Sequence, residues 1–139
     1  MSTERTLTIL KPDAVGAGHL ADILKIFEAN QFRIVAARWL RLTKAQAEGF
    51  YHVHRERPFF PSLTDFISSG PVMVMALEAE NVIARLRDVM GSTDPAKAAP
   101  GTIRKLYAQN IERNAIHGSD GPETAAYEIS YFFPGMELL

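Results

Sequence analysis

The chain has 139 residues, of which 47% are hydrophobic and 22% are charged, and its formal net charge is −1. This length and composition predict one globular domain over residues 1–139, with a core of its own. The nearly balanced charge argues against wholesale binding of nucleic acid or membranes, but a local basic patch could still bind phosphates.

The chain contains no cysteine, which excludes disulfides and Cys-ligated zinc and favours a reducing compartment. Its first ten residues, MSTERTLTIL, lack the long apolar core of a signal peptide. No stretch reaches the roughly 18 apolar residues of a membrane span. We therefore expect a cytoplasmic protein that does not enter a membrane.

The first elements follow from hydrophobic periodicity. Alternating β-branched residues predict a strand over 5–10, which the sequence Lys-Pro-Asp ends. Apolar residues at helical spacing predict a helix over 19–31. A second strand is expected over 32–42, and simple alternation places three of its side chains on one face: Ile34, Ala36 and Arg38.

The middle of the chain continues this alternation of helices and strands. Thr43 is a candidate N-cap for a helix over 44–54, and Glu48 stands too far along to complete a capping box. A short helix is expected to begin near Pro61 after a loop, and a Gly-Pro pair then precedes a buried strand over 72–78.

The last third is less regular. A helix is expected between Asn81 as N-cap and Gly91 as the C-terminal glycine. Residues 92–113 show weak periodicity, and such long connections are often functional. A short strand over 115–118 and a final helix with Pro122 in its first turn complete the chain.

This order of elements, β-α-β-(α-α)-β-α-β-α, predicts an α+β fold. We expect a ferredoxin-like βαββαβ sandwich, in which a four-stranded, mainly antiparallel sheet carries helices on one face. A flavodoxin-like parallel sheet is the alternative, but it needs more strands than the sequence supplies.

His117 lies between the apolar pair Ala115-Ile116 and the turn-forming sequence Gly-Ser-Asp-Gly. It could be a packed histidine, a metal ligand or a nucleophile. The metal interpretation is weak, because His52 and His54 are two residues apart and form no HxxxH or HExxH pattern with any other histidine. Taken alone, a histidine beside alanine and isoleucine is most often a packed residue.

A phosphate site is suggested by polar residues at the ends of predicted elements and in loops, where functional groups collect. Guanidinium, ammonium, hydroxyl and amide groups together suit phosphate oxygens. For any one of these residues an ordinary surface role is the simpler interpretation, and spacing alone does not show that they converge. The candidates are Lys11, Arg87, Thr93, Arg104 and Asn114.

Two further features complete the list of candidates. The sequence RPFFP holds Phe59 and Phe60 in a proline-bracketed loop, where an exposed ring could stack on a base; for Phe60 we favour packing in the core. Glu128 is placed on the final helix nearly opposite its apolar stripe. A carboxylate there could orient a histidine, or it could simply be solvated. The sequence contains no GxxxxGK[ST] phosphate loop.

Five segments in order carry a resemblance to a known family. They are KPDAV after the first strand, RPFFPSL, SGPV, GSTDPAKAAPGTIR and NAIHGSD around the histidine. Together they resemble the nucleoside diphosphate kinases from about Arg5 to Phe133. The resemblance implies a ping-pong enzyme that passes the γ-phosphoryl group of ATP through a phosphohistidine to a nucleoside diphosphate and so maintains NTP and dNTP pools.

The resemblance also assigns roles to individual residues. His117 matches the family nucleophile, Ser119 and Glu128 match the pair that supports it, and Tyr51 matches a tyrosine packed beside it. Phe59 matches the aromatic residue that stacks on the base. The phosphate and sugar contacts of the family match Lys11, Arg87, Thr93, Arg104 and Asn114.

The implied cofactor is Mg²⁺, held mainly by substrate phosphates and water rather than by protein ligands. The implied partners are ATP, other nucleoside tri- and diphosphates, and further copies of the chain in a tetramer or hexamer, with no requirement for nucleic acid or a membrane. A catalytically silent nucleotide-binding or scaffold module of the same fold is the alternative. Such a module would be expected to lack the histidine or one of the phosphate ligands.

Overall fold

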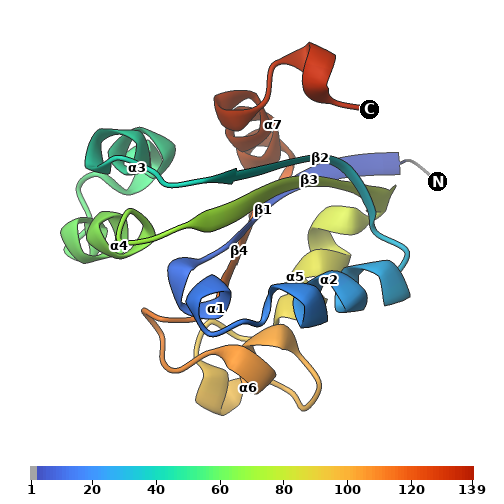
Figure 1. The fold of residues 1–139 in the computed structure, drawn as a ribbon, viewed down its shortest axis with the longest axis horizontal. Helices are drawn as coiled ribbons and strands as arrows, with labels where there is room; N and C mark the ends of the chain where they lie inside the picture. The colour runs from blue at the N-terminus through green and yellow to red at the C-terminus, as the bar shows by residue number, and fades with distance from the viewer. Residues whose placement is uncertain (1–2) are drawn as a thin grey trace.

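The computed structural model describes residues 3–139, and its centre is one four-stranded sheet (Figure 1). The strands lie in the order β2-β3-β1-β4, and every neighbouring pair is antiparallel. Their bounds are β1 Thr3–Leu10, β2 Arg33–Leu40, β3 Val72–Glu80 and β4 Ile116–Gly118. The predicted ferredoxin-like α+β fold is therefore confirmed.

Across residues 3–139, seven α-helices connect and follow these strands. Their bounds are α1 Pro12–Gly16, α2 Leu20–Ala29, α3 Lys44–Phe50, α4 Phe60–Ile67, α5 Val82–Met90, α6 Ile103–Tyr107 and α7 Pro122–Phe132. Single 3₁₀ turns occur at His52–His54, Pro95–Lys97 and Gly135–Glu137. The sequence did not predict α1 and α6, because a five-residue helix is too short to show a hydrophobic period.

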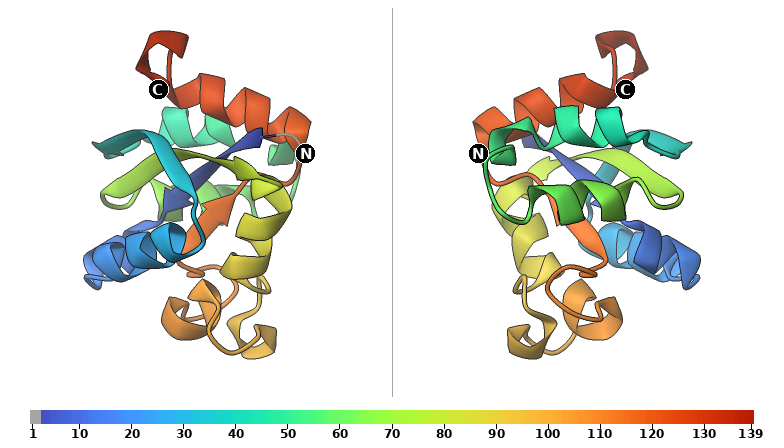
Figure 2. Two further views of the ribbon diagram at one scale, coloured as in Figure 1. Left: turned by 90° about the vertical axis from the view of Figure 1, so that its right-hand side faces the viewer. Right: turned by 90° about the vertical axis from the view of Figure 1, so that its left-hand side faces the viewer.

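Helices cover both faces of the sheet, so the expectation of one covered face was wrong. Figure 2 shows α3 and α7 on one side of the sheet and α2 and α5 on the other. The reason lies in β3, whose neighbouring residues Val74 and Met75 are both almost fully buried and belong to separate core clusters. A strand that is apolar on both faces requires a layer of structure on each side.

The prediction that Ile34, Ala36 and Arg38 share one face of β2 was also wrong. A β-bulge interrupts β2, so that Ile34 and Ala36 pair with the consecutive β3 residues Leu77 and Ala76. Consecutive positions point to opposite faces, and the extra residue of a bulge reverses the alternation beyond it. Ile34 therefore packs in one core cluster and Ala36 in the other.

Helix α3 places aromatic residues beside the end of β4. Thr43 caps this helix as predicted, but the capping box is completed by Gln46, which sequence reasoning overlooked.

Asn81 occupies the predicted N-cap position of α5 with φ 51° and makes no side-chain capping bond. Among the described residues, no helix is both long and apolar enough to cross a membrane.

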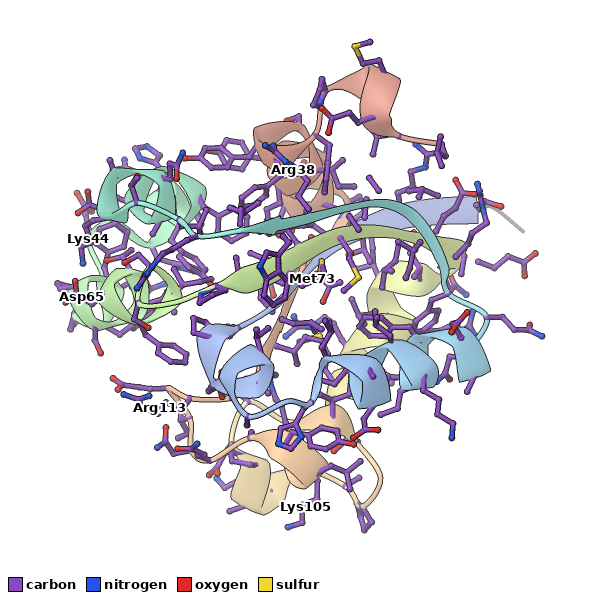
Figure 3. All side chains as sticks on the ribbon, viewed as in Figure 1. Arg38, Lys44, Asp65, Met73, Lys105 and Arg113 are labelled. Carbon is purple, nitrogen blue, oxygen red and sulfur yellow. The ribbon has the colours of Figure 1, made fainter. Side chains whose placement is uncertain are left out.

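Polar links tie the outer helices to the sheet and to one another. Figure 3 labels Lys44 and Asp65, which form an ion pair between α3 and α4. It also labels Arg38 of β2, whose Nη1 donates to the carbonyl of Phe132 at the end of α7 over 2.7 Å. These links hold α3, α4 and α7 on the face that carries the candidate site.

Candidate active site

His117 is placed by the short strand β4, where it pairs with Ile9 of β1. Its Nε2 lies 2.8 Å from Oε1 of Glu128 on α7. Because an ionised carboxylate only accepts hydrogen bonds, this contact places the imidazole hydrogen on Nε2. The lone pair of the other ring nitrogen, Nδ1, is then available, and Nδ1 has no hydrogen bond to any described residue.

Glu128 is buried rather than solvated, which corrects its predicted place opposite the apolar stripe of α7. It is only 8% exposed, and its Oε1 also accepts a hydrogen bond from Oγ of Ser119 over 2.8 Å. Ser119 Oγ in turn accepts from the backbone N–H of Leu7 over 3.2 Å. The carboxylate is therefore fixed from two sides, and it fixes the imidazole ring.

Aromatic rings pack edge-on against the imidazole. Phe50 and Tyr51 lie with their ring centroids 5.2 and 5.9 Å from that of His117. Burial and the nearby carboxylate of Glu128 raise the pKa of Tyr51, so its hydroxyl stays protonated. That hydroxyl is buried without a hydrogen-bond partner among the described residues, and it is free to donate to a bound group.

The backbone just before His117 is strained. Ala115 has φ 75°, and the N–H of Ile116 donates to the carbonyl of Asn114 over 2.9 Å. This is the rarer kind of γ-turn, which needs external support. Asp13 supplies part of it, because its Oδ2 accepts the N–H of Ala115 over 3.0 Å, while the backbone N–H of Lys11 donates to the Ala115 carbonyl.

Arg104 holds the same turn from the other side. Its Nη2 donates to the carbonyl of Ile116 over 2.8 Å and its Nη1 to the carbonyl of Gly91 over 3.1 Å. Burial and the neighbouring Arg87 lower its pKa to about 10. Arg104 therefore remains a cation at neutral pH, and it joins the end of α5 to the histidine strand.

Lys11 is a second buried cation. It is 4% exposed, and its Nζ donates to Oδ1 of Asn114 over 2.9 Å. Burial and the charge of Arg104 lower its pKa to about 8. Arg87 is more open; its Nη1 donates to the carbonyl of Gly118 over 3.1 Å and lies 3.0 Å from Oδ1 of Asp120. Cations thus gather around the histidine strand.

A cavity of about 380 Å³ adjoins this cluster. Its lining combines polar residues, among them Lys11, Thr93 and Asn114, with a larger apolar surface. Phe59 is 47% exposed at this cavity, whereas Phe60 packs partly buried in the core, as expected. The shape suits a flat apolar group with a polar, anionic tail.

Most of the sequence-predicted residues therefore converge. The side chains of His117, Ser119, Glu128 and Tyr51 pack or hydrogen-bond with one another. Arg104 and Arg87 join this network through the backbone carbonyls of Ile116 and Gly118. Thr93 and Phe59 line the cavity but make no side-chain hydrogen bond to the network.

Sequence reasoning missed the role of Asp13, although the residue lies in the quoted KPDAV segment. It also missed further cavity residues that come from two distant segments: Ser62, Leu63, Phe66, Ile111 and Glu112. No periodic or spacing signal links these segments.

Comparison with known proteins gives consistent results. The family model described as "Nucleoside diphosphate kinase" matches residues 4–138. Proteins named nucleoside diphosphate kinase from Nitrosospira multiformis and Nitratidesulfovibrio vulgaris are 57% and 56% identical to the chain, covering 99% and 98% of it and 98% of each relative.

Two solved structures share the fold. The nucleoside diphosphate kinase of Aquifex aeolicus has a TM-score of 0.97 at 47% identity, covering 99% of this chain and 100% of that one. A halophilic nucleoside diphosphate kinase from Halobacterium salinarum was solved in complex with CDP. It has a TM-score of 0.94 at 38% identity, covering 99% of this chain and 92% of that one.

Proposed function

The chain belongs to the nucleoside diphosphate kinase family, and we propose that His117 is the residue that carries the phosphoryl group in this enzyme. The activity is transfer of the terminal phosphoryl group of a nucleoside triphosphate to a nucleoside diphosphate. The alternative of a catalytically silent module has no support from these relatives. The single observation that carries the residue assignment is the Nε2–Glu128 hydrogen bond, which leaves Nδ1 as the nucleophile.

In the first half-reaction, Nδ1 of His117 attacks the γ-phosphorus of the triphosphate. An N–P bond forms, the bond from phosphorus to the bridging oxygen breaks, and the nucleoside diphosphate leaves with the electron pair. In the second half-reaction a terminal phosphate oxygen of another nucleoside diphosphate attacks the same phosphorus and forms an O–P bond. The N–P bond breaks, and its electron pair returns to Nδ1 of His117. The hydrogen on Nε2 stays directed at Glu128, which stabilises the ring while it carries the phosphoryl group.

The cations supply most of the catalysis in this proposal. The transition state of phosphoryl transfer is loose and spreads negative charge over the equatorial oxygens. Fixed donors around it then lower the barrier without reorganising. We assign this role to Arg87, Arg104 and Lys11, with the Tyr51 hydroxyl as a neutral donor; Thr93 is assigned to the phosphates and Asn114 to the sugar.

The nucleotide base is assigned to the apolar part of the cavity, against Phe59. Stacking on an aromatic face tolerates every base, as an enzyme that serves several nucleotides requires. The CDP bound to the Halobacterium relative is consistent with a nucleotide of this class as substrate.

We propose that Mg²⁺ enters the site together with the nucleotide. Among residues 3–139 there is no group of three or more His, Cys, Asp or Glu side chains arranged to hold a metal. Held chiefly by the nucleotide phosphates and water, Mg²⁺ would supply positive charge that offsets the negative charge of the phosphoryl groups during transfer. We further propose that the enzyme is a cytoplasmic homo-oligomer, either a tetramer or a hexamer. Light scattering would measure its mass and so distinguish the two.

The direct test is intact-mass measurement after mixing the protein with ATP and Mg²⁺ at neutral or alkaline pH, because phosphohistidine is acid-labile. We expect a gain of one phosphoryl group that disappears when GDP is added. The gain should be absent in His117→Ala and present in the control His52→Ala, whose histidine is exposed and outside the network. Turnover by His117→Ala comparable to that of the native chain would refute the assignment.

A further inference from the structure

The cavity lined by Lys11 and Asn114 carries one carboxylate that the proposed mechanism does not use. Glu112 lines the cavity together with Phe59, Leu63 and Phe66. Its Oε1 accepts a hydrogen bond from Oγ of Ser62 over 3.0 Å. Ser62 belongs to the first turn of α4, so this bond joins two parts of the cavity lining that are 50 positions apart in the chain.

The loop that carries Glu112 is held in place rather than loose. Oδ1 of Asn110 accepts the backbone N–H groups of Glu112 and Arg113 over 3.0 and 2.8 Å. The Arg113 guanidinium lies 5.1 Å from the centre of the Phe66 ring, which fastens the loop to α4; Figure 3 labels Arg113 on this side of the molecule. The carboxylate therefore has a defined position before any ligand enters.

The hydrogen-bonding capacity of Glu112 is only partly used. Its second oxygen, Oε2, accepts no hydrogen bond from the described residues. An ionised carboxylate accepts hydrogen bonds and donates none. The other polar residues of the cavity lining are Ser62, which holds Glu112, and the three residues assigned to the phosphates and the sugar: Lys11, Thr93 and Asn114. Among the apolar side chains that remain for the base, a polar group such as Glu112 decides which edge of a flat ligand is favoured.

Nucleotide bases differ in the hydrogen-bonding groups that their edges would present to Glu112. Cytosine offers an exocyclic amino group as donor where uracil and thymine offer a carbonyl oxygen, and carboxylates recognise the cytosine amino group. A carbonyl turned toward Glu112 would bring two acceptors together and leave both unpaired.

Building on the proposed function, we infer that Glu112 is a specificity-determining residue that favours acceptor nucleotides whose bases bear an amino group, with CDP preferred over UDP relative to a site without the carboxylate. Phe59 stacks on every base alike, and Glu112 supplies the difference between them. The hydrogen bond from Ser62 fixes the position of the Glu112 carboxylate. Ser62 and Glu112 are both exposed, so water competes for the carboxylate. The preference for CDP over UDP is therefore moderate, and UDP is still accepted.

The test uses phosphoenzyme made with ATP, freed of nucleotide, and mixed with CDP or UDP in single-turnover experiments. The measured quantity is the ratio of the second-order rate constants for the two acceptors. We expect Glu112→Gln to lower the CDP/UDP ratio roughly two- to tenfold, because the amide can turn its N–H₂ group toward the uracil carbonyl. Glu112→Ala should lower it as well.

The matched control is Glu28→Gln, which removes an exposed carboxylate from α2, a helix that contributes no residue to the cavity lining, and should leave the ratio unchanged. An unchanged ratio in both Glu112 variants would overturn the inference. So would equal slowing of CDP and UDP transfer in Glu112→Gln, because that would make the Ser62 contact purely structural. If the native chain formed no phosphoenzyme at all, the proposed role of His117 would fail instead, so the two failures are distinguishable.

Discussion

Replacing Lys11 by methionine should stabilise the fold while removing activity. The Lys11 side chain is buried, and its pKa falls from 10.5 to about 8 because burial and Arg104 disfavour the charged form. Below pH 8 both the folded and the unfolded chain hold this proton. The folded state then carries the full unfavourable free energy of burying the Lys11 ammonium group. We attribute the presence of this charge to its proposed role in binding phosphate.

The difference between these two pKa values corresponds to about 3 kcal/mol in the free energy of unfolding. Methionine has a similar length and no charge, but it leaves Oδ1 of Asn114 without its donor, which costs about 1 kcal/mol. We therefore expect Lys11→Met to be more stable than the native chain by about 2 kcal/mol at pH 7.

The pH dependence provides a second check. Between pH 8 and 10.5 the unfolded chain binds more protons at this site than the folded chain, so the native protein gains stability as pH rises. The advantage of Lys11→Met should shrink across that interval. Lys25→Met, which removes an exposed charge from α2, should stay within about 0.5 kcal/mol of the native chain.

The assay is urea unfolding at fixed protein concentration, followed by circular dichroism at pH 7, 8, 9 and 10, with nucleotide turnover measured in parallel. If Lys11→Met were less stable than the native chain at pH 7, or if its advantage did not change with pH, the argument from the buried charge would be wrong.

Three further predictions concern the histidine and its surroundings. Glu128→Gln should slow phosphoenzyme formation by about a hundredfold in rapid-mixing experiments, because the amide lacks the negative charge that stabilises the imidazole ring while it carries the phosphoryl group; an unchanged rate would remove Glu128 from the mechanism. Asp13→Ala should lower the free energy of unfolding by about 1–3 kcal/mol in urea titrations, since it orphans the buried N–H of Ala115, and stability equal to the native chain would contradict this. Phe59→Ala should weaken nucleotide binding measured by calorimetry by about 1–3 kcal/mol, similarly for all bases; a loss confined to one base would disprove simple stacking.

The sequence by itself was sufficient for the main elements and for the candidate residues. Alternation and helical spacing are local properties, and they located the strands around Leu7 and Val74 and the helix ending near Met90. The order of those elements then gave the ferredoxin-like sheet. The resemblance of five segments to one family supplied the roles expected of residues such as His117 and Arg104.

Only the tertiary structure decided how these residues meet. Glu128 appeared solvated from its helix position, yet α7 packs over the sheet and buries it against Ser119. The bulge in β2 and the second covered face depend on pairing and burial between distant segments. So does the contact between Ser62 and Glu112. Local spacing carries no record of such contacts, because they form only when closing the fold brings distant residues together.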